Sequence, residues 1–74
     1  MGDAGAQALA HSPHLGALME LYLSNNRIGD AGGRALAAST RLGGLERLFL
    51  DCNAIQAAGE EELSRRFGRK VHLR

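Results

Sequence analysis

Two segments of this chain share one hydrophobic pattern: LMELYLSNNRI at residues 18–28 and LERLFLDCNAI at residues 45–55. In both segments leucine or isoleucine occupies the first, fourth, sixth and eleventh positions, and asparagine occupies the ninth. The fourth and sixth positions alternate with outward neighbours, which is the two-residue period of a strand with one buried face. We therefore expect short strands within residues 20–24 and 47–51.

The pattern is part of a longer internal repeat of 27 residues. Residues 2–28 and 29–55 align without a gap and are identical at 15 of 27 positions. The third copy lacks four residues before its strand, so that residues 71–73 take the place of residues 48–50. The predicted organisation is a single domain, 1–74, with repeats 2–28 and 29–55 and a truncated capping repeat 56–74.

The first half of each repeat has helical spacing. Gly32, Ala35, Leu36 and Ser39 follow one another at three- and four-residue steps, which places them on one side of a helix. Asp3 and Asp30 are predicted to be N-caps of their own helices. The recurring Gly5, Gly32 and Gly59 are predicted to let each helix backbone approach the sheet.

Neither the helix nor the strand of one repeat can bury its apolar side alone. Stacked copies would place strand beside strand in a parallel sheet and helix beside helix, with the core between the two layers. Asn26 and Asn53, just after the strands, are expected to bond the backbone of each bend and to form a ladder.

The pattern LxxLxLxxNxI at 18–28 and 45–55 resembles the signature of leucine-rich repeats, and the GDAGxxALA segments resemble the helical half of the ribonuclease-inhibitor-like subfamily. That subfamily includes ribonuclease inhibitor, the sensor arrays of NOD-like immune receptors and Ran GTPase-activating protein. The resemblance covers essentially the whole chain. It implies an α/β leucine-rich-repeat solenoid, a short horseshoe segment with a concave parallel sheet and convex helices, a cytoplasmic location and protein recognition. The alternating cysteine-type repeats of ribonuclease inhibitor are missing.

The two ends of the chain differ. The first copy starts at its helix, with no strand before it, so we expect a C-terminal fragment of a longer array. The last helix is polar, with Glu60, Glu61 and Glu62 near its start and Arg65 and Arg66 near its end, which suits the helix dipole.

This charged helix is predicted to be the cap of the array. Glu61–Arg65 and Glu62–Arg66 are expected to form ion pairs four residues apart. Glu62 replaces an alanine that we expect to face inward in the first two copies, at Ala8 and Ala35. Phe67 is the candidate to close the last layer of the core.

The outward strand positions predict a binding surface made of four rows. The rows are Tyr22, Phe49 and His72; Glu20, Arg47 and Lys70; Met19, Glu46 and Arg69; and Ser24, Asp51 and Arg74. Parallel strands lie about 4.8 Å apart, so each row would form a continuous stripe. Aromatic residues flanked by charges are typical of protein-binding hot spots.

The candidate partner-binding residues are Tyr22, Phe49, His72, Glu20, Arg47, Lys70, Met19, Glu46 and Asp51. A structural role, in which Tyr22 and Phe49 stack as a cross-strand pair, is compatible with this reading.

Charge is unevenly distributed along the chain. Residues 1–64 carry four basic and eight acidic side chains, whereas residues 65–74 carry five basic side chains. The tail is interpreted as solvated, and an acidic partner would lie toward the C-terminal end. With one aromatic residue in the tail and no recognisable nucleic-acid module, the sequence disfavours nucleic-acid binding.

The sequence does not have the residue patterns of a disulfide, a catalytic thiol, a zinc site or a phosphate-binding loop. Cys52 is the only cysteine and no histidine is expected beside it, so neither a disulfide nor a catalytic thiol is predicted. Pro13 separates His11 from His14, and His72 is remote, which disfavours zinc. The glycines lack phosphate-binding spacing, so no cofactor is expected. No 18-residue apolar run or signal peptide is evident, which again indicates a cytoplasmic protein without a membrane segment.

The sequence therefore predicts a non-enzymatic protein–protein interaction module with a protein partner of unknown identity, and no catalytic, cofactor or metal site. The alternative is a GTPase-activating or other regulatory array acting on a partner enzyme, as the likeness to Ran GTPase-activating protein implies.

Overall fold

Helices and strands alternate along the chain in the order that the repeat predicts. The computed structural model describes residues 1–13 and 15–74. Its elements are α1 (Gly2–Ala10), β1 (Glu20–Tyr22), α2 (Asp30–Ala38), the 3-10 turn η1 (Thr40–Leu42), β2 (Arg47–Phe49), α3 (Ala57–Phe67), the 3-10 turn η2 (Gly68–Lys70) and β3 (Val71–His72). Both expected strands, within 20–24 and 47–51, are present.

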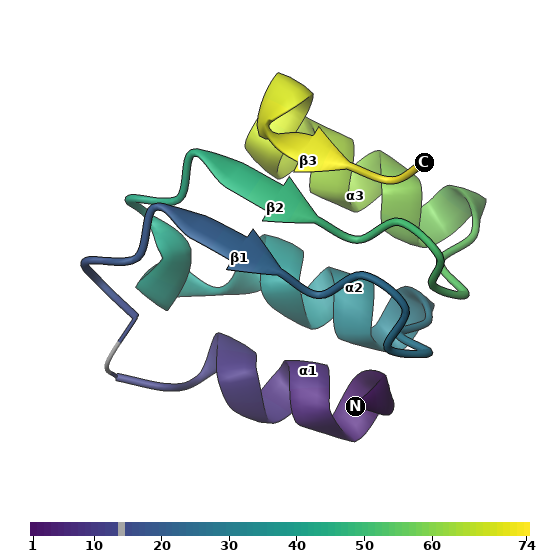
Figure 1. Ribbon diagram of the computed structural model, residues 1–74, viewed down its shortest axis with the longest axis horizontal. Coiled ribbons are helices and arrows are strands. Elements are labelled where there is room, and N and C mark those ends of the chain that lie inside the picture. The colour runs from purple at the N-terminus through teal and green to yellow at the C-terminus, as the bar shows by residue number, and fades with distance from the viewer. Residues whose placement is uncertain (14) are drawn as a thin grey trace.

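The three strands form one parallel sheet in the order β1-β2-β3. Leu21 pairs with Leu48 and Tyr22 with Phe49, and Leu48 in turn pairs with Val71. This register confirms that residues 71–73 replace residues 48–50 in the shortened copy. The helices lie side by side on one side of the sheet, and the other face of the sheet is open (Figure 1).

The core lies between the helical layer and the sheet. Its fully buried side chains are almost all leucines of the repeat pattern: Leu36, Leu42, Leu45, Leu48, Leu50 and Leu63, together with Ile28. Phe67, the last residue of α3, is 6 % exposed and belongs to the same cluster, as predicted. Within the described parts of the chain, no helix has the length and apolar character needed to cross a membrane.

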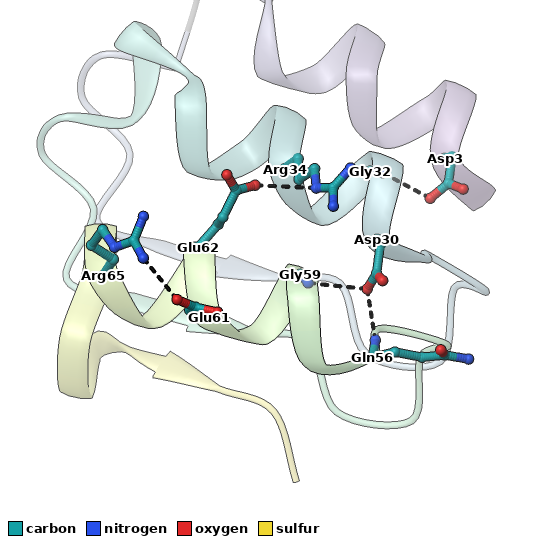
Figure 2. A network of polar contacts seen from close by, with 9 residues as sticks. All are labelled: Asp3, Asp30, Gly32, Arg34, Gln56, Gly59, Glu61, Glu62 and Arg65. Atoms are coloured by element: carbon teal, nitrogen blue, oxygen red, sulfur yellow. Dashed lines mark hydrogen bonds and ion pairs between the residues drawn. The ribbon is translucent and has the colours of Figure 1, made fainter.

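Each later helix is capped by the repeat before it. Asp3 Oδ1 accepts hydrogen bonds from the backbone N–H groups of Gly29 and Gly32, at 2.7 and 2.9 Å. The prediction that Asp3 and Asp30 cap their own helices is wrong, because Gly29 is the N-cap of α2 and Asp30 is already inside the helix. From that position the carboxylate faces the next helix, as Figure 2 shows.

The recurring glycines serve the same contact between helices. A Cβ on Gly32 would lie 2.7 Å from Asp3 Oδ1 and 3.0 Å from Ala6 Cβ. Gly32 therefore admits the preceding helix and its carboxylate, and the expected approach to the sheet is not the reason for the glycine.

The C-terminal ends of the first two helices are bonded by the repeat that follows. Ser39 Oγ donates to the carbonyl oxygen of Ala10 at 2.5 Å. One repeat later, at the position equivalent to Ser39, Arg66 donates through Nη1 to the carbonyl oxygens of Ala37 and Ser39, both at 2.8 Å. Because carbonyls at a helix end have no partner within the helix, these bonds tie successive repeats together.

The capping helix α3 differs in part from expectation. Arg65 and Glu61 form the predicted ion pair at 2.8 Å. Glu62 pairs instead with Arg34 of α2, at 3.3 Å, because Arg66 is engaged by the α2 carbonyls. Of the two equivalent alanines, Ala8 is exposed, against the prediction, whereas Ala35 is partly buried against the core as predicted.

The asparagine ladder is present between the first two repeats. Asn53 Oδ1 accepts from the backbone N–H groups of Asn26 and Ile28, at 2.8 and 3.0 Å. Asn53 Nδ2 donates to the carbonyl oxygens of Leu23 and Leu50, at 2.9 and 3.0 Å. One side chain thus joins the bends that follow β1 and β2.

Candidate functional site

The open face of the sheet, which carries Tyr22, Phe49 and His72 with their charged neighbours, is the candidate site. The three rings stack in a continuous column. The centroids of Tyr22 and Phe49 are 4.6 Å apart with an interplanar angle of 5°, and those of Phe49 and His72 are 4.6 Å apart at 11°. The predicted aromatic row is therefore a physical contact.

The column follows from the strand register. Tyr22 pairs with Phe49, which pairs with His72, so each parallel strand contributes one ring at the same level. The separation of adjacent parallel strands, about 4.8 Å, is close to the stacking distance of flat rings. Tyr22 is 64 % exposed, whereas Phe49 is half-buried between its neighbours. The rings are held flat against one another while their outer edges remain open to a partner.

Glu20 organises the polar side of this column. The Tyr22 hydroxyl donates to Glu20 Oε1 at 2.7 Å, and Arg47 Nη1 lies 3.8 Å from Glu20 Oε2. The hydrogen bond to Glu20 raises the pKa of Tyr22 above its ordinary value, because the carboxylate favours the protonated phenol. The Glu20–Arg47 pair is solvent-exposed, and such pairs contribute little to stability, about 0–1 kcal/mol. Both charges are thus accessible for contact with a partner.

Met19 and Glu46 extend the surface at the start of the strands. The N–H of Glu46 donates to the carbonyl oxygen of Met19 at 2.7 Å, which places the two residues side by side as predicted. Both residues are exposed, Met19 by 56 %. An exposed apolar side chain therefore directly precedes β1.

Comparison with protein families gives one match. Residues 17–37 match a family model described as Leucine Rich repeat. The matched segment includes β1 and most of α2. The match supports a leucine-rich-repeat protein. The comparisons with curated proteins and with solved structures gave no match.

The shortened third copy of the sequence repeat departs from two predicted rows. Arg69 and Lys70 lie in η2 and not in a strand, because the shortened copy turns directly from α3 through Gly68, whose φ is 59°. The second and third rows consequently reach only from β1 to β2. Lys70 immediately precedes β3, and Arg69 and Lys70 are both exposed.

The fourth row is also shorter than predicted. Ser24 Oγ donates to Asp51 Oδ1 at 2.5 Å, so these two side chains meet. Arg74 contacts Glu60 Oε2 of α3 at 3.2 Å instead of continuing the row. The polar contacts of the open face therefore lie mainly over β1 and β2.

The remaining predicted positions lie away from this column. Cys52 is exposed and has a φ of 58°, in the bend after β2. The sequence disfavours a zinc site at His11 and His14, and His14 lies outside the described residues.

A second surface feature lies on the helical layer of the repeats. A shallow depression of about 440 Å³ between α2 and α3 is lined by Arg34, Ala37, Ala38, Glu62, Arg65 and Arg66. Its charged groups are engaged with one another or with backbone: Arg34 with Glu62, and Arg66 with carbonyls. Figure 2 shows the Arg34–Glu62 pair, which joins α2 to α3. The Arg34–Glu62 pair is largely solvent-exposed, so it contributes little to stability.

Two features escaped the sequence reasoning. The Tyr22–Glu20 hydrogen bond joins two of the predicted rows. It could have been predicted from the sequence, because residues two apart in a strand lie on the same face. The recurrence of aspartate with a glycine one repeat later, as in Asp3 and Gly32, was the signal for capping between repeats.

Proposed function

We propose that this chain is a protein–protein interaction module that binds its partner on the open face of the sheet. In this proposal the chain is a short segment of a ribonuclease-inhibitor-like solenoid, and the open face is its concave surface. The observation that carries the proposal is the column of Tyr22, Phe49 and His72. Its rings are already ordered, so binding would immobilise few side-chain rotamers.

The charges around the column suggest how a partner is oriented. Glu20 lies in β1 and Glu46 directly precedes β2, whereas Arg69 and Lys70 directly precede β3. A partner with an acidic segment would place it toward β3, since complementary charge favours encounter in that orientation. Binding that weakens as the salt concentration rises would support a contribution of these charges, and binding that is insensitive to salt would contradict it.

The proposed test compares two double variants of the whole chain as immobilised baits in a cytoplasmic extract. Tyr22→Ala with Phe49→Ala removes two rings of the column. Arg34→Ala with Glu62→Ala removes an exposed ion pair from the helical layer and serves as the matched control. We expect bound proteins that are retained by the control and lost with the aromatic variant.

Circular dichroism must first show that both variants keep the wild-type spectrum. If the double variant does not fold, the single variant Tyr22→Ala takes its place, because the Tyr22 side chain is mostly exposed. Retention of every bound protein by both aromatic variants would refute the proposal. The GTPase-activating alternative rests on the resemblance alone. It predicts faster GTP hydrolysis by a small GTPase when the chain is added.

A further inference from the structure

Equivalent leucines are buried to different extents in the first and second repeats. In the second repeat Leu36, Leu42, Leu45 and Leu48 are at most 2 % exposed. Their counterparts 27 residues earlier, Leu9, Leu15, Leu18 and Leu21, are only partly buried. The second repeat lies between two others, whereas among the described residues the first has a neighbour on one side. These four leucines and the outer edge of β1 are called the α1/β1 end.

The equivalent face is covered in the other two repeats. The corresponding sides of the second and third repeats are each covered by the preceding repeat, with a parallel strand beside the strand and a helix beside the helix. On the strand, the N–H of Arg47 donates to the carbonyl oxygen of Met19 at 3.1 Å. Glu20 is the equivalent of Arg47, and its N–H is directed to the outer edge of β1, since N–H groups alternate sides along a strand.

The preceding repeat also supplies an aspartate in both cases. Asp3 bonds Gly29 and Gly32, and Asp30 bonds Gln56 and Gly59, in each case at the N-cap and third position of the next helix. In the first repeat, Gly2 and Gly5 occupy the positions of Gly29 and Gly32. At Gly32 and Gly59 an aspartate side chain of the preceding repeat lies against the glycine. At Gly5 the side chain of Met1, which is 59 % exposed, lies there instead.

We propose that the α1/β1 end binds a further leucine-rich repeat that carries an aspartate at this position. The added repeat would extend the sheet with a strand parallel to β1, cover Leu9, Leu15, Leu18 and Leu21, and place its carboxylate over the first turn of α1. The four leucines then meet the same groups as in the two observed junctions, and the aspartate takes over the N–H of Gly2, which in this chain donates to the carbonyl oxygen of Asn26 at 2.6 Å.

The third repeat makes this attachment directional. Ala57 stands where Asp3 and Asp30 stand in the first two copies, so the α3/β3 end offers a methyl group in place of a carboxylate. The last repeat of a second copy of this chain therefore lacks the group that the α1/β1 end is built to receive. The partner that fits is an aspartate-bearing repeat, and head-to-tail association of identical chains is disfavoured.

The test extends the chain with its own second repeat. A copy of residues 29–55 placed before Gly2, in place of Met1, recreates the Ile28–Gly29 junction. We expect the melting temperature to rise by roughly 10 °C or more, since each added interface stabilises its neighbour. The amides of Glu20 and Tyr22 should also exchange hydrogen more slowly. An unchanged melting temperature with unchanged exchange at these two amides would overturn the proposal.

Two controls separate the aspartate from the apolar contact. Asp30→Ala in the added copy only should remove about 4–8 °C of the gain, the effect of losing one helix cap. The same copy placed after Arg74 should give a smaller rise than the copy placed before Gly2. An equal rise at both ends would refute the direction. The original chain could also sediment as a dimer and show slow hydrogen exchange at the amides of Glu20 and Tyr22. That result would identify a second copy as the occupant and overturn the proposal.

Discussion

Asp30, the first residue of α2, accepts a hydrogen bond from the backbone N–H of Gly59 in α3, at a distance of 3.2 Å. The same Oδ1 accepts from the N–H of Gln56 at 2.7 Å. One carboxylate oxygen thus satisfies two donors that have no partner within their own helix. The start of α3 is therefore stabilised by a side chain from the neighbouring helix.

Asp30→Ala should destabilise the chain by about 1 kcal/mol, the usual effect of losing a helix cap. Asp30→Asn should cost less, because an amide oxygen remains as an acceptor. The measurement is urea unfolding followed by circular dichroism. Glu46→Ala is the control, since it removes the same charge from an exposed position. Equal effects of Asp30→Ala and Glu46→Ala would contradict the capping role.

Gly59→Ala should destabilise α3 although alanine is the better helix former. The new Cβ would lie 2.5 Å from Asp30 Oδ1 and 2.9 Å from Ile55 Cγ2, so the junction has to open. Crowding of this kind costs about 1–3 kcal/mol. Gly43→Ala is the matched comparison, because its Cβ meets no atom within 4 Å. Thermal unfolding should therefore show a lower melting temperature for Gly59→Ala alone.

Asn53→Ala should be far more damaging than Asn26→Ala, although the two residues are equivalent in the repeat. Asn53 bonds the backbone of both neighbouring bends, whereas the side chain of Asn26 donates to the carbonyl oxygen of Ser24 at 3.2 Å. Leaving partly buried backbone groups without partners costs about 1–3 kcal/mol each. We expect a loss of at least about 2 kcal/mol for Asn53→Ala in urea unfolding. Equal losses for the two variants would show that the ladder is not the cause.

Tyr22 should titrate above the ordinary pKa of a tyrosine in the folded chain. The hydrogen bond to Glu20 is the main cause, so Glu20→Gln should lower the pKa toward its ordinary value. Because the folded-state pKa is raised, the contribution of this bond is present below the ordinary pKa and is lost as the pH rises through the folded value. Tyr22 is the only tyrosine and the chain has no tryptophan, so ultraviolet absorbance of tyrosinate reports it directly.

The 74-residue chain on its own should melt at a low temperature, below about 65 °C. Its first repeat leaves Leu9, Leu15, Leu18 and Leu21 only partly buried, so the core is complete in the middle repeat alone. Scanning by circular dichroism tests this expectation. A cooperative transition of the monomer well above that temperature would mean that the half-buried leucines contribute more than their burial indicates.

The period of 27 residues was enough to place the strands and their register. Tyr22 faces Phe49 because the leucines on either side of each ring must face the core, and this alternation is visible in the letters. The same argument located His72 in the shortened copy. Buried leucines and strand pairing depend on spacing, which a repeat displays directly.

Polar contacts between the repeats were not predictable in the same way. Asp3 reads as the cap of its own helix, and only the packing of α1 beside α2 reveals that the acceptor serves Gly29 and Gly32. Glu62 and Arg66 have the spacing of an ion pair, yet each has a better partner in α2. Long side chains choose among several neighbours at similar distance, and that choice depends on tertiary structure.

The middle helix is held at its two ends by different neighbours: Asp3 bonds its first turn, and Arg66 bonds the carbonyl groups at its end. Release of either neighbour leaves one end of α2 without these bonds, so the loss of either outer repeat weakens the middle helix. The contacts that hold α2 at its ends therefore come from residues as far apart as Asp3 and Arg66. The stretch of chain that stabilises this one helix is longer than two periods of the sequence.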